Sequence, residues 1–162
     1  MPNETVSRMA VAGMAFTVCA SVILPIAFMI FFKRKTQGRA SCVFIGACVF
    51  VLSVLAQILV GKTLKAVVPA FAETFRENSW LLALYGGMSA GFFEETGRFL
   101  AMKFLMKKTL SKENSVMYGI GHGGIEAVLT VGVTYIVNIV IAAAVTSGKW
   151  TPFSREIGRA HV

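Results

Sequence analysis

Two short groups of polar residues interrupt apolar stretches of the chain. Glu94, Glu95 and Arg98 lie in one such stretch, and His122 and Glu126 lie in the next. Residues three or four positions apart share one face of a helix, so either glutamate of the first group can meet Arg98, and His122 can face the same way as Glu126. A charged side chain at the centre of a membrane span costs about 2.5–3.5 kcal/mol, so such residues usually serve a function. Carboxylates and a histidine on neighbouring spans are typical of a hydrolytic site inside the bilayer.

The composition indicates an integral membrane protein. The chain has 162 residues, of which 56% are hydrophobic and 15% are charged, and its mean hydropathy is +0.69. Soluble domains are less apolar and carry about 25% charged residues. Several apolar stretches approach or exceed the roughly 20 residues that cross a bilayer as a helix. We therefore predict an all-α, polytopic membrane bundle of four transmembrane helices in a single membrane domain, residues 1–155, with spans at about 9–32, 41–60, 80–106 and 114–145.

The basic residues predict the orientation of these spans. The net charge is +8, but Lys and Arg gather in short loops, which favours a role in topology over nucleic-acid binding. Since cytoplasmic loops carry the excess of positive charge, loops 33–40 and 107–113 are predicted to be cytoplasmic and the amino terminus to lie outside. The polar segment 61–79 is expected on the membrane surface, as a short amphipathic helix. The expected location is a bacterial cell membrane, with the lipid bilayer as a partner and no nucleic acid.

The end of the chain has an unusual sequence. Residues 156–162 read Glu-Ile-Gly-Arg-Ala-His-Val, which is similar to the in-frame translation of a common sequencing-library adaptor. We therefore expect an adaptor-derived artefact at 156–162 and a natural chain that continues beyond about Arg155. His161 accordingly receives no functional role.

The polar groups of the two stretches are expected at similar depth. By helix rise, Glu94 lies about 20 Å from the basic loop 107–113, and His122 lies about 15 Å from it. The glycines around His122 allow close helix approach. If Arg98 holds one glutamate ionised, the other is available as a general base. Whether that base is Glu94 or Glu95 stays open.

Two local phrases carry a resemblance to a known family. They are Phe-Glu-Glu-Thr-Gly-Arg at 93–98 and Gly-Ile-Gly-His-Gly-Gly-Ile-Glu at 119–126. Glu-Glu-x-x-Arg on one span and aromatic-x-x-x-His on the next resembles the glutamic-type intramembrane proteases, a group with CAAX-prenyl-protease and PrsW-like branches. Within it the chain resembles the YhfC-like family, up to about Thr151. The two residues between the glutamate pair and the arginine match the PrsW-like and YhfC-like branches, whereas the prenyl-protease branch has three.

The resemblance implies a function for each polar residue. The protein would hydrolyse a peptide bond of a membrane-embedded or membrane-associated peptide, with a water activated by glutamate. Glu94, Glu95 and His122 would be catalytic, and Arg98 and Glu126 would support them. No cofactor is expected. If zinc is bound, which needs three protein ligands and an open position, the ligands would be His122, Glu126 and Glu94.

The resemblance also implies a missing part and leaves two other functions open. The family carries a later span whose His and Asn or Asp stabilise the oxyanion, and loss of such donors costs about 10²–10³ in rate, so this fragment is expected to be inactive. The chain could instead translocate protons or cations along Glu94, Glu95, His122 and Glu126, or serve as a non-catalytic membrane scaffold of the same fold. One polar cluster at one depth favours a reaction chamber over a continuous path.

Overall fold

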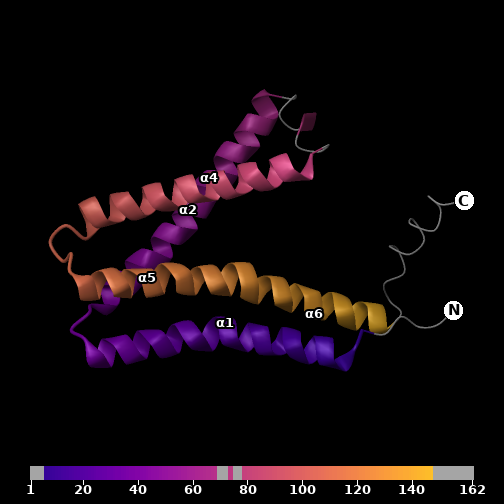
Figure 1. Cartoon of the computed structure of the whole chain (residues 1–162), viewed down its shortest axis with the longest axis horizontal. Coiled ribbons are helices and arrows are strands. Elements are labelled where there is room, and N and C mark those ends of the chain that lie inside the picture. Colours follow the sequence, from indigo (N-terminus) through magenta and orange to yellow (C-terminus); the bar gives the residue numbers. More distant parts are fainter. Residues whose placement is uncertain (1–5, 69–72, 75–77, 148–162) are drawn as a thin grey trace, which may run out of the picture. The chain divides into compact units, whose positions relative to one another are not determined.

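The computed structural model describes residues 6–68, 73–74 and 78–147, and the regular elements in these ranges are all helices (Figure 1). The all-α prediction is therefore confirmed. The expected adaptor segment, 156–162, lies outside the described residues. In chain order the elements are α1 (Arg8–Lys35), α2 (Ala40–Val67), α4 (Ser79–Leu100), the π-helix η1 (Ala101–Leu105), α5 (Lys112–Glu126), the π-helix η2 (Ala127–Gly132) and α6 (Val133–Thr146).

Three helical runs in the described part of the chain are long and apolar enough to cross a membrane. They are α1, α2 and the continuous run α5–η2–α6, Lys112–Thr146. The predicted span at about 80–106 corresponds to α4 and η1, which are not among these three helical runs. Glu94, Glu95 and Arg98 lie in the last two turns of α4 and lower its hydropathy. Three candidate spans, rather than the four predicted, are therefore supported by the described residues.

The end of α2 differs from the sequence prediction. The polar segment was expected to begin at residue 61, but α2 continues without a break to Val67. The backbone N–H of Val68 closes this end by donating to the carbonyl of Leu64 at 2.9 Å. Residues 61–67 therefore form the last two turns of α2 and not a separate surface helix. Residues 69–72 and 75–77 of that segment lie outside the described residues.

The described residues form two compact units. The first unit combines the first part of α1, up to Leu24, with the chain from Glu126 onward. In this unit the hydroxyl of Ser21 is part-buried and donates to the carbonyl of Val18 at 2.8 Å. A Cβ atom added at Gly132 would lie 2.8 Å from the oxygen of Ser21. Glycine at this position therefore allows η2 and α1 to pack closely.

The second unit, Pro25–Ile125, is built around α2, which contacts both α4 and α5. A Cβ atom at Gly46 would overlap the carbonyl of Tyr118, and one at Gly121 would overlap the carbonyl of Val43, so the backbones of α2 and α5 touch. On α4, Gly97 lies against the Ser53 hydroxyl. The buried core that these contacts enclose contains Cys42, Val49, Ala101, Met106, Met117 and Tyr118.

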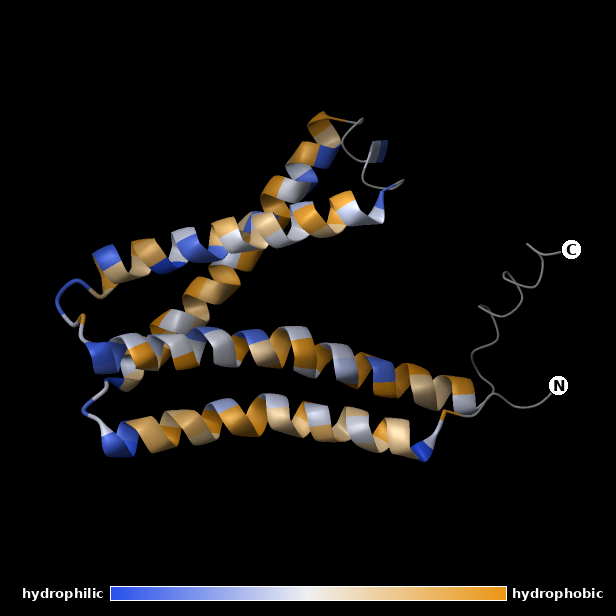
Figure 2. Ribbon diagram, viewed as in Figure 1, coloured by the Kyte–Doolittle hydropathy of each residue, from blue (hydrophilic) through white to orange (hydrophobic). Residues whose placement is uncertain are grey.

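One buried side chain joins the two basic loops of the second unit. The Asn114 oxygen accepts a hydrogen bond from the backbone N–H of Arg39 at 2.8 Å, and its amide donates to the carbonyl of Thr109 at 2.5 Å. The hydroxyl of Ser111 accepts from the backbone N–H of Asn114 at 3.2 Å and so caps the start of α5. Figure 2 shows hydrophilic residues gathered at these same loops. The two loops therefore lie at one end of the unit, as is required if both are on the same side of the membrane. That this side is the cytoplasmic one stays a prediction.

Candidate active site

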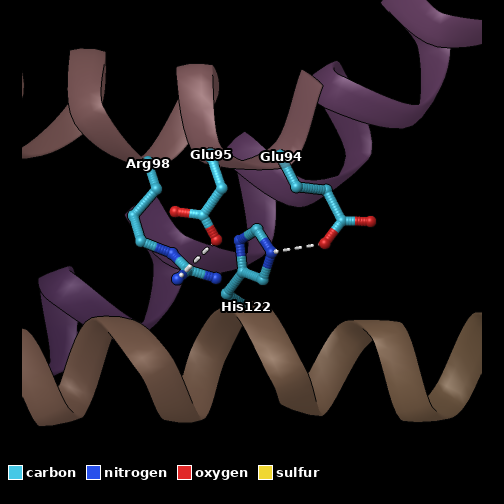
Figure 3. A network of polar contacts seen from close by, with 4 residues as sticks. All are labelled: Glu94, Glu95, Arg98 and His122. Atoms are coloured by element: carbon cyan, nitrogen blue, oxygen red, sulfur yellow. Dashed lines mark ion pairs between the residues drawn. The ribbon is translucent and has the colours of Figure 1, made fainter. Parts of the chain in front are cut away.

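The structure brings Glu94 of α4 and His122 of α5 together. The Nε2 atom of His122 lies 3.6 Å from Oε2 of Glu94 (Figure 3). This distance is too long for a hydrogen bond. His122 is 4% exposed, and neither of its ring nitrogens has a hydrogen-bond partner among the described residues. The pair thus consists of a buried imidazole and a partly buried carboxylate, a potential base, whose polar atoms are near each other without a hydrogen bond between them.

Aromatic rings hold the imidazole of His122 in place. The ring of Phe50 meets it edge-on at 5.2 Å between centroids, and the ring of Tyr118 stacks on it at 5.9 Å. Such ring contacts stabilise an orientation without using the ring nitrogens. The orientation of His122 is therefore fixed by packing, and both of its nitrogens stay available for chemistry.

The two adjacent glutamates have different surroundings. Oε1 of Glu95 pairs with a guanidinium nitrogen of Arg98 at 3.0 Å on the same helix, and the two side chains are 67% and 41% exposed. The side chain of Glu94 is 25% exposed and faces His122 (Figure 3). Neighbouring positions on a helix point about 100° apart, so two adjacent residues can meet different partners. Here the carboxylate of Glu94 lies beside the histidine, and that of Glu95 pairs with Arg98.

Glu126 follows His122 by one turn of α5. It is half-buried and is the last residue of that helix, directly before η2. Its carbonyl accepts a hydrogen bond from the hydroxyl of Thr130 at 2.6 Å. Residues four apart lie on one helix face, so α5 presents Glu126 on the side of His122. A π-helical turn inside a long helix often occurs at a functional site, and here it starts directly after the two polar residues.

The aromatic neighbours of His122, Phe50 and Tyr118, are not among the residues for which the sequence predicts a role. Tyr118 is the aromatic residue of the aromatic-x-x-x-His phrase, so a signal for it was present. Phe50 lies on α2, more than seventy positions from His122, and no local pattern connects the two. The contact exists because Gly46 and Gly121 let α2 and α5 touch at this level.

Comparisons with known proteins identify the family of the chain. A family model described as YhfC intramembrane metalloprotease matches residues 20–157. The chain belongs to the YhfC family. It is 38% identical over 148 residues to the uncharacterized membrane protein YhfC of Bacillus subtilis (strain 168), an alignment that covers 90% of this chain and 56% of that relative. The chain therefore spans just over half the length of the relative it matches. No solved structure matches the chain.

Membership of the YhfC family confirms the resemblance seen in the two polar phrases. Together with the three apolar helices, it shows that this is a membrane protein. The family description names a protease that uses a metal ion, which bears on both the type of enzyme and the possible ligands of the site. The five polar residues at 94, 95, 98, 122 and 126 all lie within the matched part of the chain.

Proposed function

We propose that this YhfC-family chain carries part of the active site of an intramembrane protease, in which Glu94 and His122 activate water to hydrolyse a peptide bond of a membrane-embedded peptide. The single observation that carries the proposal is the pair itself: carboxylate and imidazole 3.6 Å apart, with both imidazole nitrogens buried and unbonded among the described residues. Buried polar atoms nearly always have a hydrogen-bond partner. We infer that these atoms bind a group that the described residues do not supply.

The chemistry of the pair follows from its acceptor atoms. Glu94 takes a proton from a water held between the carboxylate and His122, as the water oxygen bonds to the carbonyl carbon of the substrate. The carbon–nitrogen bond then breaks, and the proton passes to the leaving amine. A positioned general base and acid contributes about 10²–10⁴ in rate. Glu95 is paired with Arg98 and has the supporting role, since it balances the charge of the guanidinium.

The same side chains fit a zinc ion, and the family description favours this form. Zinc binds histidine nitrogen and carboxylate oxygen at roughly 2.0–2.2 Å, so two ligands of a tetrahedral ion lie about 3.3–3.5 Å apart. The 3.6 Å between Glu94 and His122 is close to this value. Glu126 is the proposed third ligand, because it is one turn from His122 on the same helix and offers a carboxylate oxygen. When bound, zinc would lower the pKa of its water to about 7 and so supply the nucleophile.

The site also bears on the topology. We propose that α4 and η1 form a fourth span, since a helical run over residues 79–105 is about 40 Å long and a bilayer core is about 30 Å thick. Its Glu94 lies 3.6 Å from His122 of the apolar run 112–146, which supports placing the polar residues of α4 within the membrane. With the basic loops 33–40 and 107–113 at one end, the positive-inside rule supports a cytoplasmic position for both and an outside amino terminus in a bacterial membrane.

Cleavage is tested in cells that express the complete reading frame containing these residues. New amino termini of membrane proteins are identified by mass spectrometry in cells with the wild-type protein, with Glu94→Gln and with His122→Gln. We expect termini that depend on the wild-type protein and disappear in both variants. Glu95→Gln is the matched control, because it removes the neighbouring carboxylate and leaves the pair intact. Termini that persist unchanged in Glu94→Gln would falsify the proposed role of that residue.

Metal binding is tested on the purified chain in detergent. Zinc bound per chain is measured by atomic emission after dialysis, for the wild type and for Glu94→Gln, His122→Gln and Glu126→Gln. One zinc per chain in the wild type and less in each variant is expected, with Glu95→Gln unchanged. A wild-type chain without zinc, together with cleavage that resists a chelator, would reject the metal form and leave the carboxylate as the base.

A further inference from the structure

Tyr118 has no role in the proposed chemistry, yet its hydroxyl is unexplained by the fold. It is the largest fully buried side chain in the described part of the molecule, at 1% exposure. Its hydroxyl is buried and has no hydrogen-bond partner among the described residues. Tyr118 precedes His122 by one turn of α5, and the two rings stack. The hydroxyl therefore belongs to the same buried region as the Glu94–His122 pair.

A buried hydroxyl without a partner is destabilising. Leaving such a group unpaired costs about 1–3 kcal/mol, whereas phenylalanine would fill the same space without this cost. The ring contact with His122 needs only the aromatic ring and not the oxygen. Packing thus accounts for an aromatic residue at position 118 but does not account for a tyrosine. An oxygen that the described part of the fold does not use is available to a partner from outside the described residues.

The surroundings of the phenol indicate which kind of partner it meets. Figure 3 shows His122 with Glu94 on one side and the Glu95–Arg98 pair on the other. The ring of Tyr118 stacks on the imidazole of His122, and the carboxylate of Glu94 lies 3.6 Å from the same imidazole. A hydrogen-bond donor and a base beside one imidazole match the two oxygens of the reaction, the substrate carbonyl and the attacking water.

We propose that the Tyr118 hydroxyl is a catalytic hydrogen-bond donor that binds the carbonyl oxygen of the scissile peptide bond. This proposal rests on the proposed function of the site. When water attacks, the electron pair of the carbonyl double bond moves to that oxygen, and a neutral phenol that keeps its proton stabilises the resulting oxyanion. No bond to Tyr118 forms or breaks. The electron pair returns when the carbon–nitrogen bond breaks and the amine leaves with its proton.

The test is Tyr118→Phe in the complete reading frame, with Tyr135→Phe on α6 as the matched control. The substrate is a fluorogenic peptide that spans a Glu94-dependent cleavage site found by profiling of amino termini. We expect kcat to fall by about 10²-fold or more in Tyr118→Phe, as for other lost oxyanion donors, with KM changed by less than about threefold. The melting temperature in detergent should be unchanged or higher, because an unpaired buried hydroxyl is removed. Tyr135→Phe should match the wild type in both measurements.

Three outcomes would overturn the proposal, and they can be told apart. Normal kcat in Tyr118→Phe, with cleavage still dependent on Glu94, rejects the donor role and leaves the proposed function standing. A lower melting temperature in Tyr118→Phe shows that the hydroxyl serves the fold. Absence of Glu94-dependent cleavage in the wild-type protein rejects the proposed function and the donor role with it.

Discussion

Asn114 and His122 lie two turns apart on α5, are both less than 10% exposed, and differ in every other respect. The Asn114 side chain makes hydrogen bonds to the backbone of Arg39 and Thr109, and the backbone N–H of Asn114 donates to the hydroxyl of Ser111. The His122 ring makes none among the described residues. A buried polar side chain that serves the fold is bonded by the fold, and one that serves chemistry keeps its atoms free. The comparison separates the structural end of the second unit from its proposed reactive centre.

The two regions also differ in what they contribute to stability. Each hydrogen bond at the Asn114 end contributes about 0.5–1.5 kcal/mol, and those bonds hold the two basic loops together. The unbonded atoms of His122 and Tyr118 are destabilising until a ligand binds. Active sites commonly reduce stability in this way, and other parts of the protein offset the loss. The following substitutions test this division, from the largest expected effect to the smallest.

The largest effect is expected at the reactive centre. His122→Gln should reduce the rate of cleavage by about 10²–10⁴, since it removes a positioned acid–base group. Its melting temperature should stay near the wild-type value, because no hydrogen bond of the fold is lost. Rates are measured with the fluorogenic peptide, and melting is followed by circular dichroism in detergent. A large fall in melting temperature would place His122 with Asn114 among the structural residues.

A large effect on stability is expected where the backbones of α2 and α5 touch. Gly121→Ala adds a Cβ atom that overlaps the carbonyl of Val43, so the helices must separate, at a cost of about 1–3 kcal/mol or more. Gly123→Ala is the matched control, because a Cβ atom there meets no atom within 4 Å. The yield of folded protein from membranes and its melting temperature measure the difference. Equal yields for the two variants would contradict the close contact.

An intermediate effect is expected at the loop end. Asn114→Ala leaves the N–H of Arg39 and the carbonyl of Thr109 without their partner, and we expect a loss of about 1–3 kcal/mol in stability. Zinc binding, measured below the melting temperature, should not change. Ser115→Ala, at the next position, is the control. If Asn114→Ala is as stable as the wild type, the hydrogen bonds of Asn114 do not stabilise the fold, and the contrast between Asn114 and His122 is wrong.

The smallest effect is expected at the exposed Glu95–Arg98 ion pair of α4. Glu95→Gln breaks an exposed ion pair with Arg98, and such pairs contribute about 0–1 kcal/mol to stability. The melting temperature of the chain in detergent should therefore change little, and zinc binding should not change. A loss as large as that of Asn114→Ala would show that the pair is buried in the assembled protein.

Much of this protein could be predicted from its sequence because the relevant rules are local. Apolar stretches set the membrane class, and two short phrases identified the family. Helix periodicity predicted that Arg98 can pair with a glutamate three positions away and that Glu126 shares a face with His122. The end of α2 was less predictable. Lysines within residues 61–67 suggested a surface segment, but long side chains can extend from a continuing helix and do not end it.

The sequence alone determined which stretches form helices, which polar residues they carry and how these residues are spaced along each helix. Tertiary structure decided which of these residues meet. The choice of Glu94 over Glu95 as the neighbour of His122, and the contact of Phe50 with the imidazole, depend on how α4 and α5 are rotated against α2. That rotation is set by glycine contacts between residues far apart in the chain, at Gly46, Gly97 and Gly121. Periodicity relates residues within one helix, and only packing between helices decides which face turns inward.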